Sequence, residues 1–574
     1  MASDFEQQLQ QLLRSLYPAE RRPALIADIL ALIEKWRLPR EQRSQSVDEK
    51  TIYLIAYGDG LYQDDEKPLR VLKQFADRWL QGLISDIHLL PMFPWTSDDG
   101  FSVVDYRRIN PELGDWTDIH ALHQHYDLMF DCVINHVSSA SLWFQAYLRG
   151  EEKYQHYFIE ADPQADYHSV MRPRALPLLT PYVKANHQRV YLWTTFSEDQ
   201  IDLNFREPAV LLESIDILLQ YAASGGRSIR LDAIGFIWKA AGTACIHLPE
   251  VHQIIKLWRL VLDRANTHCR LITETNVPHS ENIRYFGNGD EAHMVYQFPL
   301  PPLTLHAFLR QNTRWLNAWA TRLSAETQPI NTTFFNFLAS HDGIGLRPTE
   351  NLLDDAERAF LVAEVERKDG RISWRNNPDG SKSPYELNIN YLDALCEPDD
   401  GVNTKADKFV AAQSILLAFR GVPALYYHSL LGSRSDLAGV ARSGINRRIN
   451  REKLQLKSLE QQLVEPGTLR AEVFHRLRHL IYCRRTQPAF APQAAQRVLK
   501  LGDALFGIER AEQRGQERIS CVVNVSAAPQ TLHLPLPGTD LIAMTAFDGS
   551  MTLRPWQAVW IKHSAPDGPR CATL

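Results

Sequence analysis

Eight short runs of apolar, β-branched and aromatic residues recur along this chain, with helical stretches between them. The runs span residues 52–57, 87–90, 128–134, 228–231, 271–273, 294–298, 333–337 and 422–427. Strands that alternate with helices form right-handed βαβ units, and about eight such units close into a TIM barrel. The pattern therefore predicts an α/β fold, a (β/α)8 barrel with its chemistry at the carboxyl ends of the strands.

Three segments do not fit this repeat and indicate added modules. The first has apolar residues at helical spacing, the second is too long for an ordinary connection, and the third has short alternating runs separated by turns. The predicted domains are a helical N-terminal extension (1–48), the catalytic barrel (49–137 and 205–480), an inserted domain over the active site (138–204) and a C-terminal β domain (481–574).

Charge and cysteine content exclude several classes of protein. A net charge of −6 in 574 residues gives no reason to expect nucleic acid or an anionic membrane as a partner. The seven cysteines are scattered, odd in number and without CxxC spacing, so neither a disulfide framework nor a zinc site is expected. The first residues are acidic, unlike a secretory signal, and no run approaches the ~20 apolar residues of a membrane span. We expect a soluble, cytoplasmic protein.

Polar residues stand at the ends of strands that should be plainly apolar. Asp232 and Glu274 end the fourth and fifth runs, and Asp342 follows the seventh. Taken alone, each acid is better explained as a helix cap or as half of an ion pair. Three acids at one edge of a barrel, with Arg230 and His341 beside them, would be a costly cluster of like charges without a function. The set therefore predicts an active site.

Glycosyl transfer with retention is the chemistry that needs such a set. One carboxylate attacks the sugar and one carboxylic acid protonates the leaving oxygen. Arg230 is expected to lower the pKa of Asp232, which suits a nucleophile, and desolvation to raise that of Glu274, which suits an acid/base. Asp342 can accept hydrogen bonds from the sugar hydroxyls. His136 and His341 can donate them, but each is equally well explained as a structural histidine.

Six motifs carry a resemblance to a known family. The chain closely resembles the α-amylase superfamily (glycoside hydrolase family 13) and, within it, the sucrose phosphorylase group. The motifs are Ala56-Tyr-Gly-Asp59, His88-Leu-Leu-Pro91, Ser97-Asp-Asp-Gly-Phe101, Arg172-Pro-Arg174, His341-Asp-Gly-Ile-Gly345 and Arg447-Arg-Ile-Asn-Arg451.

The resemblance implies a role for each matching residue. Asp232 is implied as the nucleophile, Glu274 as the acid/base and Asp342 as the transition-state stabiliser. The residues that would hold the glucosyl unit are Asp98, His136, Arg230, His341 and Arg447. The residues that would bind phosphate or the acceptor are Arg172, Arg174, Tyr385 and Lys382, although Arg172 and Arg174 can also be explained as a solvated loop pair.

The finer resemblance is to glucosylglycerate phosphorylases. It rests on the helical extension, on residues 273–279 and 290–297, and on Asn376-Asn-Pro-Asp-Gly380 before Ser383-Pro-Tyr-Glu386. It implies reversible phosphorolysis of 2-O-α-glucosylglycerate to α-glucose 1-phosphate and glycerate by double displacement. The glycerate carboxylate would need a cation, and the sequence leaves five candidates: Arg172, Arg347, Lys382, Arg434 and Arg448.

Other functions remain as alternatives. A sucrose phosphorylase or a glucosylglycerol phosphorylase would use the same catalytic residues with a neutral acceptor. An α-glucoside hydrolase and a non-catalytic barrel that serves as a scaffold are the remaining possibilities. We expect no cofactor beyond phosphate as co-substrate, because no nucleotide-binding or metal-ligand spacing is present. Asn135 matches a position where some relatives bind calcium, but phosphorylases of this group generally do not, so no metal is expected.

Overall fold

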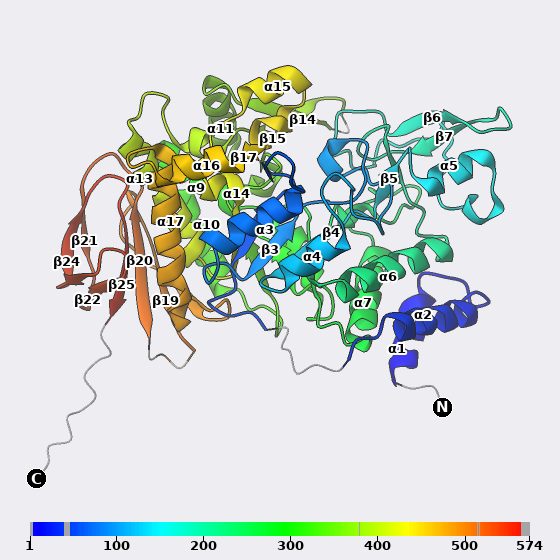
Figure 1. Cartoon of the computed structure of the whole chain (residues 1–574), viewed down its shortest axis with the longest axis horizontal. Helices are drawn as coiled ribbons and strands as arrows, with labels where there is room; N and C mark the ends of the chain where they lie inside the picture. Colours follow the sequence, from blue (N-terminus) through cyan, green and yellow to red (C-terminus); the bar gives the residue numbers. More distant parts are fainter. Residues whose placement is uncertain (1–3, 40–45, 378, 514, 516, 564–574) are drawn as a thin grey trace, which may run out of the picture.

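The computed structural model describes residues 4–39, 46–377, 379–513, 515 and 517–563. At its centre is a closed barrel of eight strands in the order β1-β16-β12-β11-β10-β9-β4-β3 (Figure 1). The strands are β1 (Tyr53–Ala56), β3 (Asp86–Leu89), β4 (Asp127–Cys132), β9 (Gly226–Leu231), β10 (Arg270–Thr273), β11 (Met294–Tyr296), β12 (Thr333–Asn336) and β16 (Val422–Tyr426). Each predicted run overlaps one of them, so the predicted (β/α)8 barrel is confirmed.

Helices cover the outside of the barrel and bury apolar faces against it. In α7, for example, Val251, Ile254 and Trp258 recur at helical spacing and are buried. The main barrel helices are α3 (Pro68–Trp79), α4 (Trp116–His123), α6 (Pro208–Ala223), α7 (Pro249–Arg264), α9 (Leu300–Arg310), α10 (Arg314–Ala325), α13 (Val402–Ala418) and α17 (Leu469–Arg485). Shorter helices are α8 (His279–Asn282), α12 (Tyr391–Leu395), α14 (Tyr427–Leu430), α15 (Leu437–Ser443) and α16 (Leu456–Val464). No helix in the described part of the chain has both the length and the apolar character of a membrane span.

Strand register fixes which polar residues meet at the carboxyl edge of the barrel. Arg230 on β9 lies opposite Asp131 on one neighbouring strand and Ile272 on the other. The pairing continues past the strands, because the Asp232 N–H donates to the Cys132 carbonyl (3.3 Å) and the Glu274 N–H to the Leu231 carbonyl (3.2 Å). Asp232 and Glu274 therefore leave adjacent strands at the same level.

The chain leaves the barrel after β4 and forms a small lobe of its own. Two antiparallel strand pairs, β5 with β8 and β6 with β7, support it, and the ring of Phe144 packs between those of Tyr147, Phe158 and Tyr182. Its elements are β5 (His136–Ser138), α5 (Leu142–Arg149), β6 (Leu179–Val183), β7 (Arg189–Trp193) and β8 (Gln200–Asp202). The lobe lies at the opposite end of the molecule from the C-terminal strands (Figure 1).

A second excursion follows β12, in a stretch where the sequence pattern gave no elements. A three-stranded sheet in the order β13-β15-β14 forms there, and its strands are antiparallel. The elements are β13 (Ile344–Gly345), a 3-10 turn (Arg347–Thr349), α11 (Asp355–Arg367), β14 (Arg371–Asn376) and β15 (Lys382–Asn388). This sheet brings residues from β15 to the carboxyl edge of the barrel.

The C-terminal strands form a β unit that packs against the barrel helices α10 and α13 and has a small core of its own. A six-stranded sheet in the order β18-β19-β20-β25-β22-β23 and a pair β21-β24 enclose residues such as Val522, Leu532 and Val559. The strands are β18 (Ala495–Val498), β19 (Leu505–Ala511), β20 (Arg518–Asn524), β21 (Gln530–His533), β22 (Gly538–Asp540), β23 (Thr545–Phe547), β24 (Ser550–Leu553) and β25 (Ala558–His563). Helix α17 runs through the predicted boundary at residue 481, so we propose that this domain begins after Arg485.

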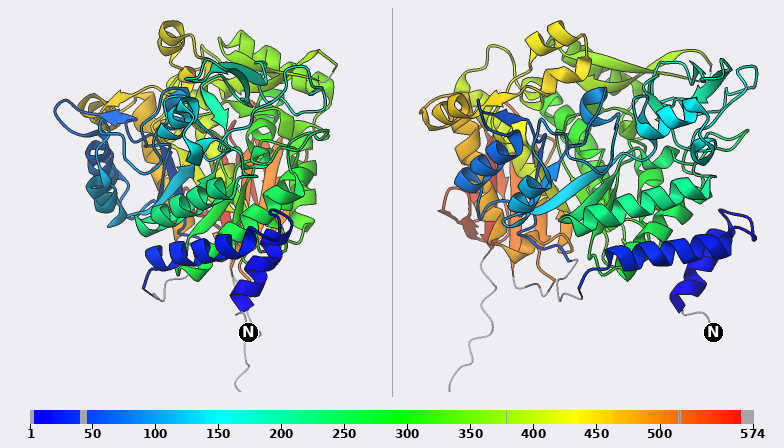
Figure 2. Two further views of the ribbon diagram at one scale, coloured as in Figure 1. Left: turned by 90° about the vertical axis from the view of Figure 1, so that its right-hand side faces the viewer. Right: turned by 45° about the vertical axis from the view of Figure 1, so that its right-hand side comes forward.

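The N-terminal helices α1 (Asp4–Arg14) and α2 (Arg22–Trp36) lie against α6 and α7 (Figures 1 and 2). Asp216 on α6 anchors the end of α2, since its carboxylate accepts hydrogen bonds from Lys35 (2.9 Å) and from the Trp36 indole (2.7 Å). The other oxygen of this carboxylate pairs with Arg107 at 2.7 Å. The extension is therefore part of the barrel's outer layer.

Removing the apolar contact of α2 should loosen the extension. Ile29 is fully buried on α2, so Ile29→Ala is expected to weaken this packing by about 2–5 kcal/mol through lost burial and a cavity. The midpoint of thermal unfolding should fall relative to the native protein. Asp28→Ala, on the exposed side of the same helix, serves as the control and should leave the midpoint unchanged. Equal effects of the two changes would contradict the docking role.

Candidate active site

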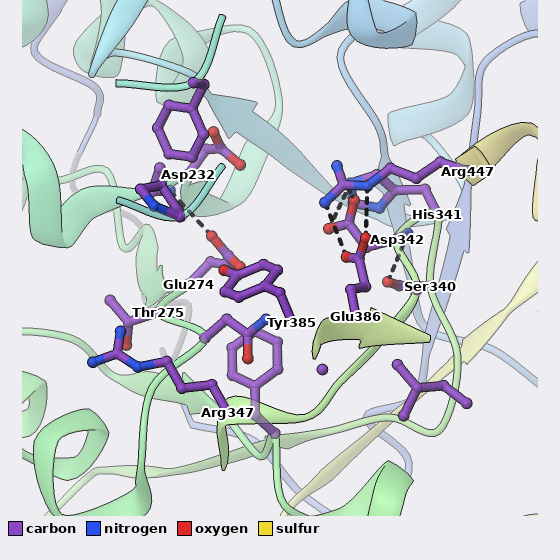
Figure 3. A pocket seen from close by; sticks show the side chains of 18 of the residues that line it. Asp232, Glu274, Thr275, Ser340, His341, Asp342, Arg347, Tyr385, Glu386 and Arg447 are labelled. Carbon is purple, nitrogen blue, oxygen red and sulfur yellow. Dashed lines mark hydrogen bonds and ion pairs between the residues drawn. The ribbon is translucent and has the colours of Figure 1, made fainter. Parts of the chain in front are cut away.

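The three predicted acids line one pocket at the carboxyl edge of the barrel. Asp232, Glu274 and Asp342 all line this pocket, whose empty space is about 1210 Å³ including the open solvent at its mouth. Figure 3 shows Glu274 between two groups of side chains, with Asp342 and Arg447 on one side. The structure thus brings together residues that are far apart in the sequence.

A single buried arginine links three carboxylates at the floor of this pocket. One nitrogen of Arg230, Nη1, lies 2.7 Å from Asp232 and 2.5 Å from Asp131. Its other terminal nitrogen lies 3.7 Å from Glu274. Asp131 is also 2.6 Å from the ring of His88. Sequence reasoning gave Asp131 and His88 no role, although both stand at strand positions where an apolar residue was expected.

The expected pKa of Asp232 is wrong in its net direction. Burial raises the pKa of this carboxyl, and the Arg230 guanidinium opposes the increase without cancelling it. The expectation considered the arginine but not the loss of water around the carboxylate. Arg230 still makes the ionised form of Asp232 possible, because an unpaired carboxylate buried this deeply would be far more costly.

Glu274 has the pKa of a working proton donor. Burial first, and then the charges of Asp232 and Asp342, raise its pKa to about 7, while Arg230 opposes the shift from a greater distance. The backbone N–H of Ala233 donates to its carboxylate at 3.1 Å. Ala233 has φ of 48°, a left-handed conformation that is strained for alanine and typical of functional sites. This strained turn therefore holds Glu274 beside Asp232.

Asp342 is held in its ionised form by arginines. Burial alone would raise its pKa, but Arg447, His341 and Arg451 outweigh burial and hold the pKa well below the usual range. Arg447 contacts Asp342 at 2.7 Å and is itself held by two bonds to Glu386, of 3.1 and 2.9 Å. Glu386 on β15 was missed by sequence reasoning, because nothing in the local pattern indicates its partner 61 residues away.

Asp98 lies on the same wall of the pocket. It and Asp99 both have positive φ, of 51° and 48°, so two successive residues adopt the left-handed conformation. Arg451 stabilises this turn by a bond of 2.7 Å to Asp99 and lies 3.6 Å from Asp98. Burial would raise the pKa of Asp98, but Arg447 and Arg451 lower it on balance. The Asp98 carboxylate is thus an ionised hydrogen-bond acceptor that faces the pocket.

The two histidines also line the pocket. His341 stacks on Phe101 with 4.7 Å between ring centres, and burial lowers its pKa to about 3, so its ring is neutral at pH 7. His136 is buried with its Nε2 atom 2.8 Å from the Phe101 carbonyl oxygen. Both rings line the pocket, and the two nitrogens of His136 are already in contact with Phe101 and Asn135.

The residues predicted for the phosphate and acceptor region divide into two groups. Arg172, Arg174, Tyr385 and Arg347 line the pocket. Lys382 does not: it is exposed at the far end of β15. Arg434 is half-exposed and pairs with Asp393, and Arg448 pairs with Asp99 behind the pocket. Arg375 on β14 also lines the pocket and was missed by sequence reasoning.

Asn135, a position where some relatives bind calcium, already contacts a cation from the chain itself. The ammonium group of Lys239 lies 3.0 Å from the Asn135 amide oxygen and 2.6 Å from the Asp202 carboxylate. All three side chains are buried. Throughout the described ranges, no group of three or more His, Cys, Asp or Glu residues is arranged to hold a metal ion.

Comparison with known proteins places this site in a family. Residues 79–350 match the family described as the catalytic domain of α-amylase. The chain is 47% identical over 529 residues to the glucosylglycerate phosphorylase of Escherichia coli strain K12, which covers 92% of this chain and 94% of that protein. The chain belongs to the glucosylglycerate phosphorylase family of α-amylase-type proteins. The family resemblance indicated by the sequence motifs is therefore confirmed.

Two further relatives agree with this placement. The glucosylglycerate phosphorylase of Allomeiothermus silvanus is 46% identical over 545 residues, which is 94% of this chain and 96% of that protein. Among solved structures, the sucrose 6F-phosphate phosphorylase from Thermoanaerobacter thermosaccharolyticum has a TM-score of 0.72 at 24% identity, and covers 83% of this chain and 94% of that one. The latter likeness concerns the fold.

The raised pKa of Glu274 predicts a cost in stability. Its pKa rises from 4.5 to about 7 on folding, so the folded state binds this proton more tightly than the unfolded state. The stability that the bound proton contributes is fully present below pH 4.5 and is lost as the pH rises through 7. Glu274→Gln cannot ionise and should be more stable than the native protein at pH 8, by about 1–3 kcal/mol. Thermal unfolding at pH 8 and at pH 4.5 checks this. A gain of the same size at both pH values would contradict the assignment.

Proposed function

We propose that the protein is a retaining α-glucosyl phosphorylase that converts 2-O-α-glucosylglycerate and phosphate to α-glucose 1-phosphate and glycerate. The observation that carries the proposal is the buried pair Asp232 and Glu274 on one arginine, in a chain that aligns with glucosylglycerate phosphorylases over nearly its whole length. Asp232 has its counter-charge at 2.7 Å, whereas Glu274 is 3.7 Å from it. This difference suits one acid to attack and the other to donate a proton.

In the first step Asp232 attacks the anomeric carbon of the glucosyl unit. The bond between that carbon and the glycosidic oxygen breaks, and Glu274 transfers its proton to the leaving oxygen. Glycerate leaves, and a β-glucosyl ester remains on Asp232. Asp98, Asp342 and Arg447 lie on the opposite wall, where their charged groups can hold the sugar hydroxyls as the ring distorts.

In the second step an oxygen of hydrogen phosphate attacks the same carbon. The phosphate proton passes to Glu274, the ester bond to Asp232 breaks, and α-glucose 1-phosphate leaves with its configuration retained. Both acids then return to their starting states. Phosphate is an anion that must bind near these acids, so it needs cations or hydrogen-bond donors. Arg172, Arg174 and Tyr385 line the same pocket and can supply them.

The proposed function is tested by release of α-glucose 1-phosphate in the presence of phosphate. Purified protein is expected to use 2-O-α-glucosylglycerate in preference to 2-O-α-glucosylglycerol and sucrose, and to release no glucose 1-phosphate without phosphate. Asp232→Asn should reduce the rate by about 10⁴-fold or more, because the catalytic groups act as a unit. Preference for glucosylglycerol or sucrose would agree with the proposed mechanism but would contradict glycerate as the acceptor. Release of free glucose alone would indicate a hydrolase.

Arg174 offers a separate test of phosphate binding. Its guanidinium lies 6.0 Å from the centre of the Phe196 ring and lowers the pKa of nearby Asp98, so it faces the pocket. Arg174→Ala should raise the KM for phosphate about 10- to 100-fold, the loss of one charge-assisted hydrogen bond. The KM for the glucosyl donor should change little. Equal increases in both constants would mean that Arg174 only supports the loop.

A further inference from the structure

The acceptor carboxylate needs a cation close to Glu274. In 2-O-α-glucosylglycerate the carboxylate carbon is bonded to the carbon that carries the glycosidic oxygen, the atom that Glu274 protonates. A second negative charge so close to Glu274 and Asp232 would be strongly repelled in a buried pocket. This requirement rests on the proposed function, and it concerns only the acceptor end of the pocket.

Arg347 lies on this side of the catalytic acid. It follows β13 directly, and β13 pairs with β15 so that Gly345 is opposite Glu386. The next residue, Leu346, donates its N–H to the Tyr385 carbonyl at 3.0 Å. In Figure 3 the ring of Tyr385 lies between Glu274 and Asp342, and Arg347 lies below them, away from Asp342 and Arg447. Arg347 therefore lines a different part of the pocket from Asp342 and Arg447, the residues proposed to hold the sugar.

The charge of Arg347 is poorly compensated by the protein. The residue is 9% exposed, and its Nε atom is buried with no hydrogen-bond partner in the described part of the chain. The carboxylate it contacts, Glu281, is 3.7 Å away and also bonds His247 at 3.1 Å. Arg375 on the same wall differs, because Glu350 pairs with it at 2.8 Å. A buried guanidinium in this state is prepared for an anionic ligand.

Asn276 adds a second unsatisfied group at the same place. Its amide oxygen is buried with no hydrogen-bond partner among the described residues, and the side chain lines the pocket. The amide packs against Gly345, where an added Cβ would lie 2.6 Å from the amide oxygen, so only glycine allows this contact. Asn276, two residues after Glu274, thus packs against the strand that leads into Arg347, and both side chains line the pocket.

We propose that Arg347, with Asn276 beside it, binds the carboxylate of the acceptor and selects glycerate over glycerol. The planar guanidinium can hold both carboxylate oxygens, and the Asn276 amide can bond a hydroxyl of the same acceptor. Arg172, Arg174 and Tyr385 are then left for phosphate. Of the five cations that the sequence left open for the carboxylate, Arg172 and Arg347 line the pocket, and each has a buried Nε atom with no hydrogen-bond partner among the described residues. The packing of Asn276 against Gly345, two residues before Arg347, favours Arg347.

The test compares an anionic and a neutral acceptor of nearly the same shape. Arg347→Gln and Arg347→Lys are assayed with 2-O-α-glucosylglycerate and with 2-O-α-glucosylglycerol. Arg172→Gln is the rival candidate, and Arg434→Gln, a half-exposed arginine outside the pocket, is the matched control. Exchange of labelled phosphate into α-glucose 1-phosphate is measured for every protein, because this reaction needs the glucosyl site and phosphate but no acceptor.

Arg347→Gln is expected to lower kcat/KM for glucosylglycerate about 10- to 100-fold and to change that for glucosylglycerol less than about 3-fold. Phosphate exchange should persist, which also shows that the variant folds, and Arg347→Lys should recover part of the loss. Arg434→Gln should behave like the native protein. Equal losses with both substrates, or a selective loss in Arg172→Gln instead, would overturn the inference. Absence of phosphate exchange in the native protein would overturn the proposed function itself.

Discussion

The catalytic side of the pocket depends on one buried guanidinium, that of Arg230. It compensates Asp131 and Asp232 directly and Glu274 at longer range. Burial raises the pKa of both acids, and the charge of Arg230 opposes that increase in each. Asp232 lies 2.7 Å from Arg230 and Glu274 lies 3.7 Å from it, so the arginine favours the ionised form of Asp232 more strongly than that of Glu274. The proposed chemistry, which needs one ionised and one protonated acid, therefore depends on the position of a single side chain.

The opposite wall is organised by ion pairs between loops. Arg447 and Arg451 follow the last barrel strand, and they hold Asp342 and the turn at Asp98 from two other loops. Glu386 completes the arrangement by holding Arg447 with two hydrogen bonds. Because these segments come from separate parts of the barrel, the proposed binding of the sugar by this wall depends on all of them being folded at once.

The residues proposed to bind phosphate and the acceptor come from loops, whereas the proposed catalytic acids follow barrel strands. Asp232 and Glu274 follow barrel strands whose register fixes them, whereas Arg174 lies in the lobe after β4 and Arg347 in the excursion after β12. Loops on a rigid scaffold can change without disturbing the scaffold. An α-amylase-type barrel can therefore keep the same bond-breaking step while residues of its loops select the acceptor.

The sequence by itself determined the barrel and the places of its acids. Buried parallel strands leave a strong apolar pattern, so a polar residue at a strand end such as Asp232 or Glu274 is conspicuous. Only the tertiary structure decided that burial outweighs Arg230 at Asp232, that Glu386 holds Arg447, and that Arg347 lines the pocket while Lys382 does not. These outcomes depend on desolvation and on the paths of long loops, which bring together residues with no local pattern in common.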